Sequence, residues 1–78
     1  MSKLIQFPAD DNAPRDLVAR LKLHPGAIRV SELARILTMS RTTLYQMVED
    51  GRIPHYRLGD SIRFDPVRVG DWLAKQAA

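Results

Sequence analysis

The sequence of 78 residues contains no cysteine and no long hydrophobic run. The absence of cysteine excludes a disulfide and a cysteine-ligated zinc as means of stabilising a small fold. A membrane-spanning helix needs about 18 or more consecutive apolar residues, and no segment here approaches that length. The first residues carry a single lysine, Lys3, and few apolar side chains, so they do not resemble a secretory signal. We therefore expect one cytoplasmic domain without membrane association.

Residues that carry catalysis are also scarce. The only two histidines, His24 and His55, are far apart in the sequence, and neither has a carboxylate cluster nearby. Asp10 and Asp11 fall in a predicted tail. Metal and acid–base sites require such groups to converge, so we expect no enzyme activity, no metal and no cofactor.

Positive charge is present and is mostly arginine. The formal net charge is +3, and between Arg29 and Arg68 every basic residue is arginine. The planar guanidinium group suits phosphate oxygens and guanine edges better than a lysine ammonium does. This distribution favours an anionic partner, and double-stranded DNA is one partner of that kind.

The N-terminal third divides into two predicted segments. Residues 1–13 read as a flexible arm, and residues 14–27 as a short helix followed by a connection. The apolar side chains at helical spacing are Leu17, Val18 and Leu21. The sequence leaves open whether this helix packs on the rest of the chain, pairs with another subunit or contacts a partner protein.

Residues 28–78 contain the sharpest pattern. Ser31 is placed to cap a helix that ends near Leu37, and Ser40 to cap a second helix that Gly51 closes. The two-residue connection makes this a helix-turn-helix. Around the small Ala34, the positions that such a motif fills with apolar side chains are occupied by Leu33, Leu37, Met39, Leu44 and Met47.

A β-hairpin and a last helix follow. Residues 56–58 and 62–64 alternate apolar and basic side chains, which is typical of strands. We expect a three-residue loop at 59–61, because it places the four apolar side chains on one face. The expected pairs are Leu58 with Ile62, Tyr56 with Phe64 and Arg57 with Arg63. Asp65 then caps a helix, from Pro66 to about Lys75, that buries Val69, Trp72 and Leu73.

The predicted fold is therefore mainly α with a small β-hairpin, a winged helix-turn-helix. If the apolar side chains of the second helix are buried, its candidate DNA contacts are Ser40, Arg41, Thr42, Thr43, Tyr45 and Gln46. Those of the hairpin, or wing, are Arg57, Gly59, Ser61 and Arg63. Short hydroxyls and arginine at a helix N-terminus suit phosphate, and the longer side chains can reach base edges. The alternative is a merely solvated surface.

The stretch from Val30 to about Leu73 resembles the excisionase-type helix-turn-helix family, which is related to the DNA-binding domain of the mercury-resistance regulators. The segments that carry the resemblance are Val30–Leu37, Met39–Tyr45, Gly51–Pro54, Tyr56–Gly59 and Trp72-Leu73. The resemblance implies a winged helix with its second helix in the major groove and its hairpin at the flanking minor groove. One departure is Thr38, which stands where such turns often have glycine and which predicts some backbone strain.

Members of that family have two kinds of role. Excisionases, or recombination directionality factors, bind repeated sites, bend the DNA and bias a site-specific integrase towards excision; others are small transcriptional regulators. We expect the first role, with an integrase as a partner and cooperative self-association on DNA. A transcriptional regulator of the same fold remains an alternative, as does a protein-interaction module that binds no DNA.

Overall fold

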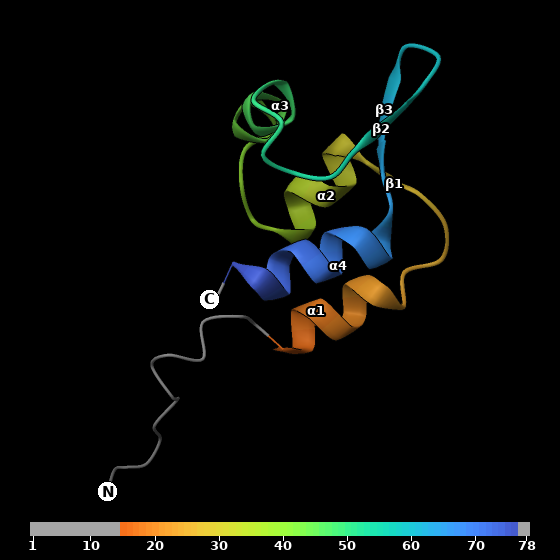
Figure 1. The fold of residues 1–78 in the computed structure, drawn as a ribbon, viewed down its shortest axis with the longest axis vertical. Helices are drawn as coiled ribbons and strands as arrows, with labels where there is room; N and C mark the ends of the chain where they lie inside the picture. Colours follow the sequence, from red (N-terminus) through yellow and green to blue (C-terminus); the bar gives the residue numbers. More distant parts are fainter. Residues whose placement is uncertain (1–14, 77–78) are drawn as a thin grey trace, which may run out of the picture.

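The computed structural model describes residues 15–76 as a mainly helical winged fold with a small antiparallel sheet (Figure 1). In chain order the elements are α1 (Arg15–Lys22), β1 (Ile28–Arg29), α2 (Val30–Ile36), α3 (Arg41–Glu49), β2 (Tyr56–Leu58), β3 (Ser61–Phe64) and α4 (Pro66–Lys75). The predicted arm, residues 1–13, lies outside the described residues. The predicted fold class is confirmed. None of the helices described is long and apolar enough to cross a bilayer.

Helix α3 begins and ends where its sequence predicts. The N–H of Thr43 donates to Ser40 Oγ at 3.0 Å, which satisfies one of the free donors of the first turn. At the other end Gly51 has φ +67°, and its N–H donates to the Val48 carbonyl at 3.0 Å. The N–H of Arg52 donates to the carbonyl of Met47 at 2.9 Å, completing a Schellman cap. Both ends of α3 are therefore fixed by local chemistry.

Helix α2 also ends in a Schellman cap, but a threonine occupies the left-handed position that glycine occupies after α3. The N–H of Met39 donates to the Ala34 carbonyl at 2.9 Å, and Thr38 between them has φ +53°. Among the described residues other than glycine, Thr38 alone has a positive φ. A left-handed conformation costs an L-residue about 1–2 kcal/mol. The strain that the sequence predicted at this turn is present.

The start of α2 differs from the prediction. Ser31 is not the cap, because α2 begins at Val30 and Arg29 occupies the N-cap position without a side-chain hydrogen bond. The reason is that α2 follows directly from β1, a two-residue strand that the sequence analysis missed. Ser31 is instead an exposed residue of the first helical turn.

The predicted hairpin exists, but its predicted register is wrong. The observed partners are Tyr56 with Arg63, Arg57 with Ile62 and Leu58 with Ser61, so the loop has two residues, Gly59 and Asp60. Gly59 has φ +61° at the first loop position, which is the conformation that a type II′ turn requires and that glycine adopts at no steric cost. The two-residue turn therefore sets the register, and the four apolar side chains of the hairpin do not share one face.

The third strand explains which face of the sheet is buried. The strand order is β1-β3-β2, and Ile28 of β1 pairs with Phe64 of β3. Both side chains are fully buried, so they mark the inner face of the sheet. Successive side chains of a strand point to opposite faces, and this pair therefore fixes which residues of each strand point inward. Tyr56 and Leu58, predicted to be inside, lie on the outer face and are 41% and 58% exposed. The expected Arg57–Arg63 pair does not form.

The core joins all the helices to the sheet. Its buried apolar members are Leu21, Ile28, Val30, Leu33, Ala34, Leu44, Val48, Ile53, Phe64 and Val69. Of the five apolar positions predicted around Ala34, Leu33 and Leu44 are fully buried. The other three, Leu37, Met39 and Met47, are partly buried against the same core. Burial of these side chains turns the opposite ridge of α3 outward.

Helix α1 packs against α4, so the first of the three possibilities that the sequence left open, packing on the rest of the chain, is observed. Leu21 of α1 is 2% exposed within the common core. A Cβ on Gly70 of α4 would lie 2.7 Å from Lys22 Cγ, so the lysine stem crosses the helix where there is no side chain. Lys22 Nζ also lies 2.6 Å from Asp71 Oδ1, and this contact lowers the pKa of Asp71. On the same helix, Trp72 Nε1 donates to the Arg52 carbonyl at 2.8 Å.

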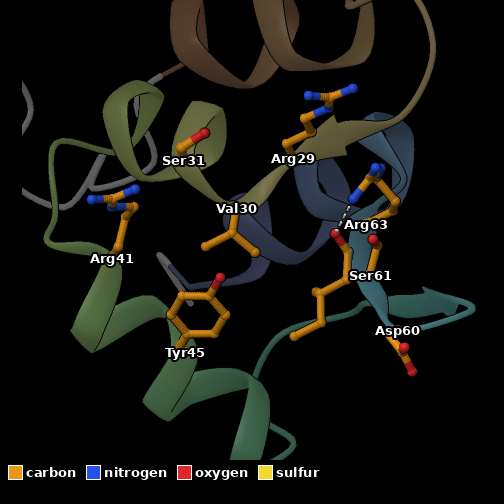
Figure 2. A pocket seen from close by; sticks show the side chains of 9 residues that line it. Arg29, Val30, Ser31, Arg41, Tyr45, Asp60, Ser61 and Arg63 are labelled. Carbon is orange, nitrogen blue, oxygen red and sulfur yellow. Dashed lines mark hydrogen bonds between the residues drawn. The ribbon is translucent and has the colours of Figure 1, made fainter.

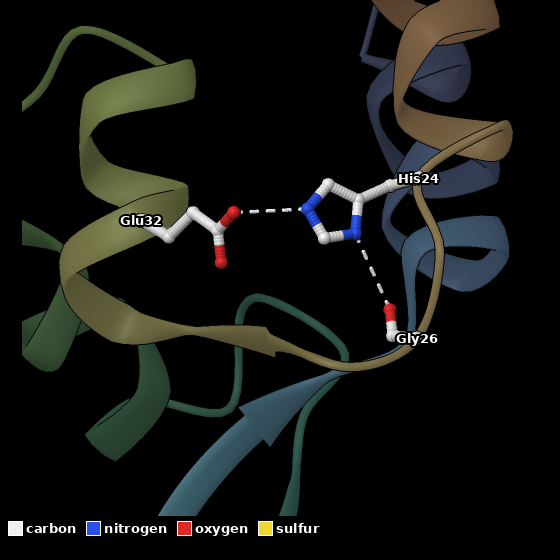
Figure 3. A network of polar contacts seen from close by, with 3 residues as sticks. All are labelled: His24, Gly26 and Glu32. Carbon is white, nitrogen blue, oxygen red and sulfur yellow. Dashed lines mark hydrogen bonds and ion pairs between the residues drawn. The ribbon is translucent and has the colours of Figure 1, made fainter.

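A second contact ties the end of α1 to α2 (Figure 3). His24 Nε2 lies 3.0 Å from Glu32 Oε2, and His24 Nδ1 lies 3.4 Å from the Gly26 carbonyl. Because both ring nitrogens face acceptors, the doubly protonated imidazolium is favoured. The hydrogen bond with Glu32 is the main cause that raises the pKa of His24 and lowers that of Glu32. These contacts hold α1 on the side of the molecule away from α3.

Candidate nucleic-acid interface

The outward ridge of α3 contains all the candidate contacts that the sequence assigned to this helix. Each is exposed: Ser40, Arg41, Thr42, Thr43, Tyr45 and Gln46. Tyr45 is 48% exposed although it is a large aromatic residue. In Figure 1, α3 and the hairpin of β2 and β3 lie at the end of the molecule away from α1. Among the described residues, no element covers this ridge, so it is accessible to a partner.

An open groove separates α3 from the wing (Figure 2). Nine residues line it: Arg29, Val30, Ser31, Arg41, Tyr45, Asp60, Ser61, Ile62 and Arg63. Arg41 and Tyr45 contribute from α3, and Ser61 and Arg63 from β3. Four of the ten residues that the sequence singled out are thus brought to a common groove.

Sequence reasoning missed three of the polar lining residues, Arg29, Ser31 and Asp60. Arg29 and Ser31 enter because β1 pairs with β3, a contact between residues more than thirty positions apart in the chain. The only signal for Arg29 in the sequence was its place at the start of the arginine-only stretch. Asp60 belongs to the turn of the wing.

The groove is lined by three arginines that form no ion pair with any residue of the described range 15–76. Arg29, Arg41 and Arg63 come from three different elements and line the same space. The ion pairs formed among residues 15–76 lie elsewhere: Lys22–Asp71, His24–Glu32 and Arg52–Asp50. Asp60 is the one carboxylate in the lining, and it forms no such pair. Three arginines spread along the lining of one open groove suit an anion of extended shape.

Two hydroxyls at the start of α3, those of Ser40 and Thr43, hydrogen-bond to each other. Ser40 Oγ accepts the N–H of Thr43 and donates to Thr43 Oγ1 at 2.8 Å. Ser40 therefore has little capacity left, whereas the Thr43 hydroxyl still has its own hydrogen to donate. Thr42, next to them, is exposed without this commitment.

The remaining wing candidates lie beyond the groove. Arg57 and Gly59 are exposed on the projecting part of the hairpin and do not line it. Arg57 is opposite Ile62, and its side chain alternates with those of Tyr56 and Leu58. The wing therefore presents arginine on both of its faces, with Arg63 on the other one.

A metal centre is not assembled within the described part of the chain. No group of three or more histidine, cysteine, aspartate or glutamate side chains converges among those residues. His24 has a carboxylate partner, Glu32, that sequence reasoning did not find because eight positions separate them. This pair is a link between helices and lies apart from the groove.

Two short helices joined by a tight turn and followed by a hairpin define a winged helix-turn-helix protein. The model of a family described as a helix-turn-helix domain matches residues 27–77, which is more than half of the chain. The chain belongs to this helix-turn-helix family, whose characteristic partner is DNA. Comparisons with curated proteins and with solved structures return no significant match.

Proposed function

We propose that the protein binds double-stranded DNA by placing α3 in the major groove and the wing against the flanking backbone and minor groove. The observation that carries this proposal is the groove between α3 and β3, with one arginine on each side, Arg41 and Arg63. A major groove about 12 Å wide accepts an α-helix, and a hairpin beside it then meets the phosphate strand at its edge.

The two surfaces have different tasks in this proposal. The long side chains of the exposed ridge, Arg41, Tyr45 and Gln46, can reach base edges. The hydroxyl groups of Thr42 and Thr43 donate hydrogen bonds to phosphate oxygens. Arg57, exposed on the wing, neutralises backbone charge or enters the minor groove, where arginine responds to groove width. Gly59 and Ser61 are small and exposed, so they allow the wing to approach the duplex closely.

Within the DNA-binding class we propose the role of an excisionase, which binds adjacent sites cooperatively, bends the DNA and biases a cytoplasmic site-specific integrase. The family includes excisionase-like domains. A single small module buries only about 600–1,000 Å² on DNA, which favours cooperation between copies to reach high specificity. The protein acts by occupying and deforming DNA and catalyses no step itself.

A mobility-shift titration across salt concentrations tests DNA binding. A protein that neutralises several phosphates loses affinity steeply as salt rises, with a slope of about −0.9 for each phosphate. We expect a shift at low salt and a steep slope. A flat salt response, or no shift at low salt, would favour a protein-interaction module instead.

Substitutions test the division of labour between helix and wing. Arg41→Ala should weaken binding to the preferred site by about 1–3 kcal/mol and relax the base preference at one position. Arg57→Ala should weaken all sequences alike and flatten the salt slope. Arg20→Ala on α1, exposed and remote from the groove, removes the same charge and serves as the control. If the first two variants behaved alike, the proposed division would be wrong.

Gels with circularly permuted DNA fragments separate the two family roles. The excisionase proposal predicts bending and the successive occupation of neighbouring sites. A straight fragment occupied once favours a transcriptional regulator of the same fold.

A further inference from the structure

Two arginines lie directly opposite each other on the outer face of the sheet. Arg29 of β1 is the register partner of Arg63 of β3, and Tyr56 of β2 follows in the same row. Like charges that face each other across a strand pair destabilise the sheet. The sequence offered Arg57 as the partner of Arg63, and the structure puts Arg29 there instead.

Within the described part of the chain, no carboxylate forms an ion pair that would relieve this repulsion. None of the ion pairs among residues 15–76 involves Arg29 or Arg63. Arg63 is partly buried, and its Nη1 donates to the Ile62 carbonyl at 3.0 Å, which holds the guanidinium near the strand. Arg29 is exposed (Figure 2). Each guanidinium therefore keeps donors that no described residue uses.

We propose that Arg29 and Arg63 together bind one phosphate of the DNA backbone, an inference that rests on the proposed DNA binding. A phosphodiester has two unbridged oxygens, and two planar guanidinium groups from adjacent strands can each donate to one of them. The anion would neutralise the facing charges, so a pair that is unfavourable in the free protein becomes favourable in the complex.

This phosphate would also fix how the two reading elements sit on the duplex. Arg29 immediately precedes α2, and Arg63 belongs to the wing, so a phosphate held by both lies at the junction of helix-turn-helix and hairpin. Arg41 lines the same groove from α3. The backbone contact thereby sets the register in which α3 enters the major groove.

The test is a double-substitution cycle on a random-sequence duplex, read by fluorescence anisotropy over a range of salt. The variants are Arg29→Gln, Arg63→Gln and both together, with Arg20→Gln as the control for net charge. We expect Arg29→Gln to bind about tenfold more weakly than Arg20→Gln, since a hydrogen bond to a charged group is lost. The salt slope of the double variant should fall by about 0.9, the value for one phosphate.

Once one arginine is replaced, replacing the other should weaken DNA binding by less than a further factor of two, because both arginines bind the same phosphate. If the losses of affinity from the two single substitutions multiplied in the double variant and its salt slope changed by about 1.8, the arginines would bind separate phosphates, which would overturn the inference. Binding by Arg29→Gln equal to that of Arg20→Gln would overturn it while leaving DNA binding intact. Failure of the wild type to bind at low salt would overturn both.

The free protein provides a readout without DNA. Inorganic phosphate should raise the melting temperature of the wild type more than that of Arg29→Gln, with Arg20→Gln behaving like the wild type. Arg63→Lys keeps the positive charge but loses the planar pair of guanidinium donors. It should therefore reproduce most of the loss of DNA affinity seen in Arg63→Gln. Equal phosphate effects on the wild type and Arg29→Gln would contradict a shared anion site.

Discussion

Replacing Thr38 by glycine should stabilise the protein, because the turn between α2 and α3 holds a β-branched residue at φ +53°. Relief of the left-handed conformation is worth about 1–2 kcal/mol. Glycine in turn increases the entropy of the unfolded chain, at a cost of about 0.4–1 kcal/mol. The Thr38 side chain is exposed, so its removal leaves no cavity. The expected net gain is about 0.5–1 kcal/mol, or about 2–8 °C in melting temperature for a domain of this size.

Urea unfolding and thermal unfolding followed by circular dichroism measure this change. Gly51→Ala is the matched control, since Gly51 has φ +67° at the same position of the same cap on α3 and a Cβ there would meet no atom within 4 Å. It should lose stability where Thr38→Gly gains it. DNA affinity should be unchanged in Thr38→Gly. A neutral or destabilising effect of Thr38→Gly would refute the assignment of strain to this turn.

Two further predictions concern the packing of α1. The pKa of His24 is raised above 6.5 and that of Glu32 lowered below 4.5, so the contact between them stabilises fully between those pH values. The stability difference between wild type and His24→Gln should therefore be largest near about pH 5.5 and shrink as the pH rises through the folded pKa of His24; a difference independent of pH would contradict it. Gly70→Ala should be neutral or destabilising in the wild type, because its Cβ would lie 2.7 Å from Lys22 Cγ. In a Lys22→Ala background the same change should stabilise by up to about 1 kcal/mol, and additive effects in the cycle would exclude this close packing.

Much of the helix-turn-helix could be predicted because its signals are local. The cap at Ser40, the stop at Gly51 and the spacing of Leu44 and Met47 all lie within one turn or two of the structure that they determine. The exposed ridge of α3 then follows from what is buried. The strain at Thr38 was likewise visible from a single turn position.

The wing was predicted in outline and misread in register. Periodicity gave two strands, but the assumption that Tyr56 and Leu58 must be buried led to a three-residue loop. In the structure the core face of β3 carries Phe64, which pairs with Ile28 of β1, and the partly buried Ile62. The edge strand β2 can therefore leave its apolar side chains outside. The pairing of β1 with β3 is a tertiary contact, which no local pattern reveals. For the same reason the sequence could not place Arg29 in the groove.

The most direct measurement is a titration of the isotope-labelled protein with a DNA duplex, followed by amide chemical shifts in nuclear magnetic resonance spectra. The proposed interface predicts the largest changes in residues 40–46, at the N-terminal part of α3 with its cap, and in residues 57–63 of the wing, with a further change at Arg29. Helix α1, on the far side of the molecule, should change little. Changes concentrated on α1 and α4, or no changes at low salt, would contradict DNA binding through the groove between α3 and the wing.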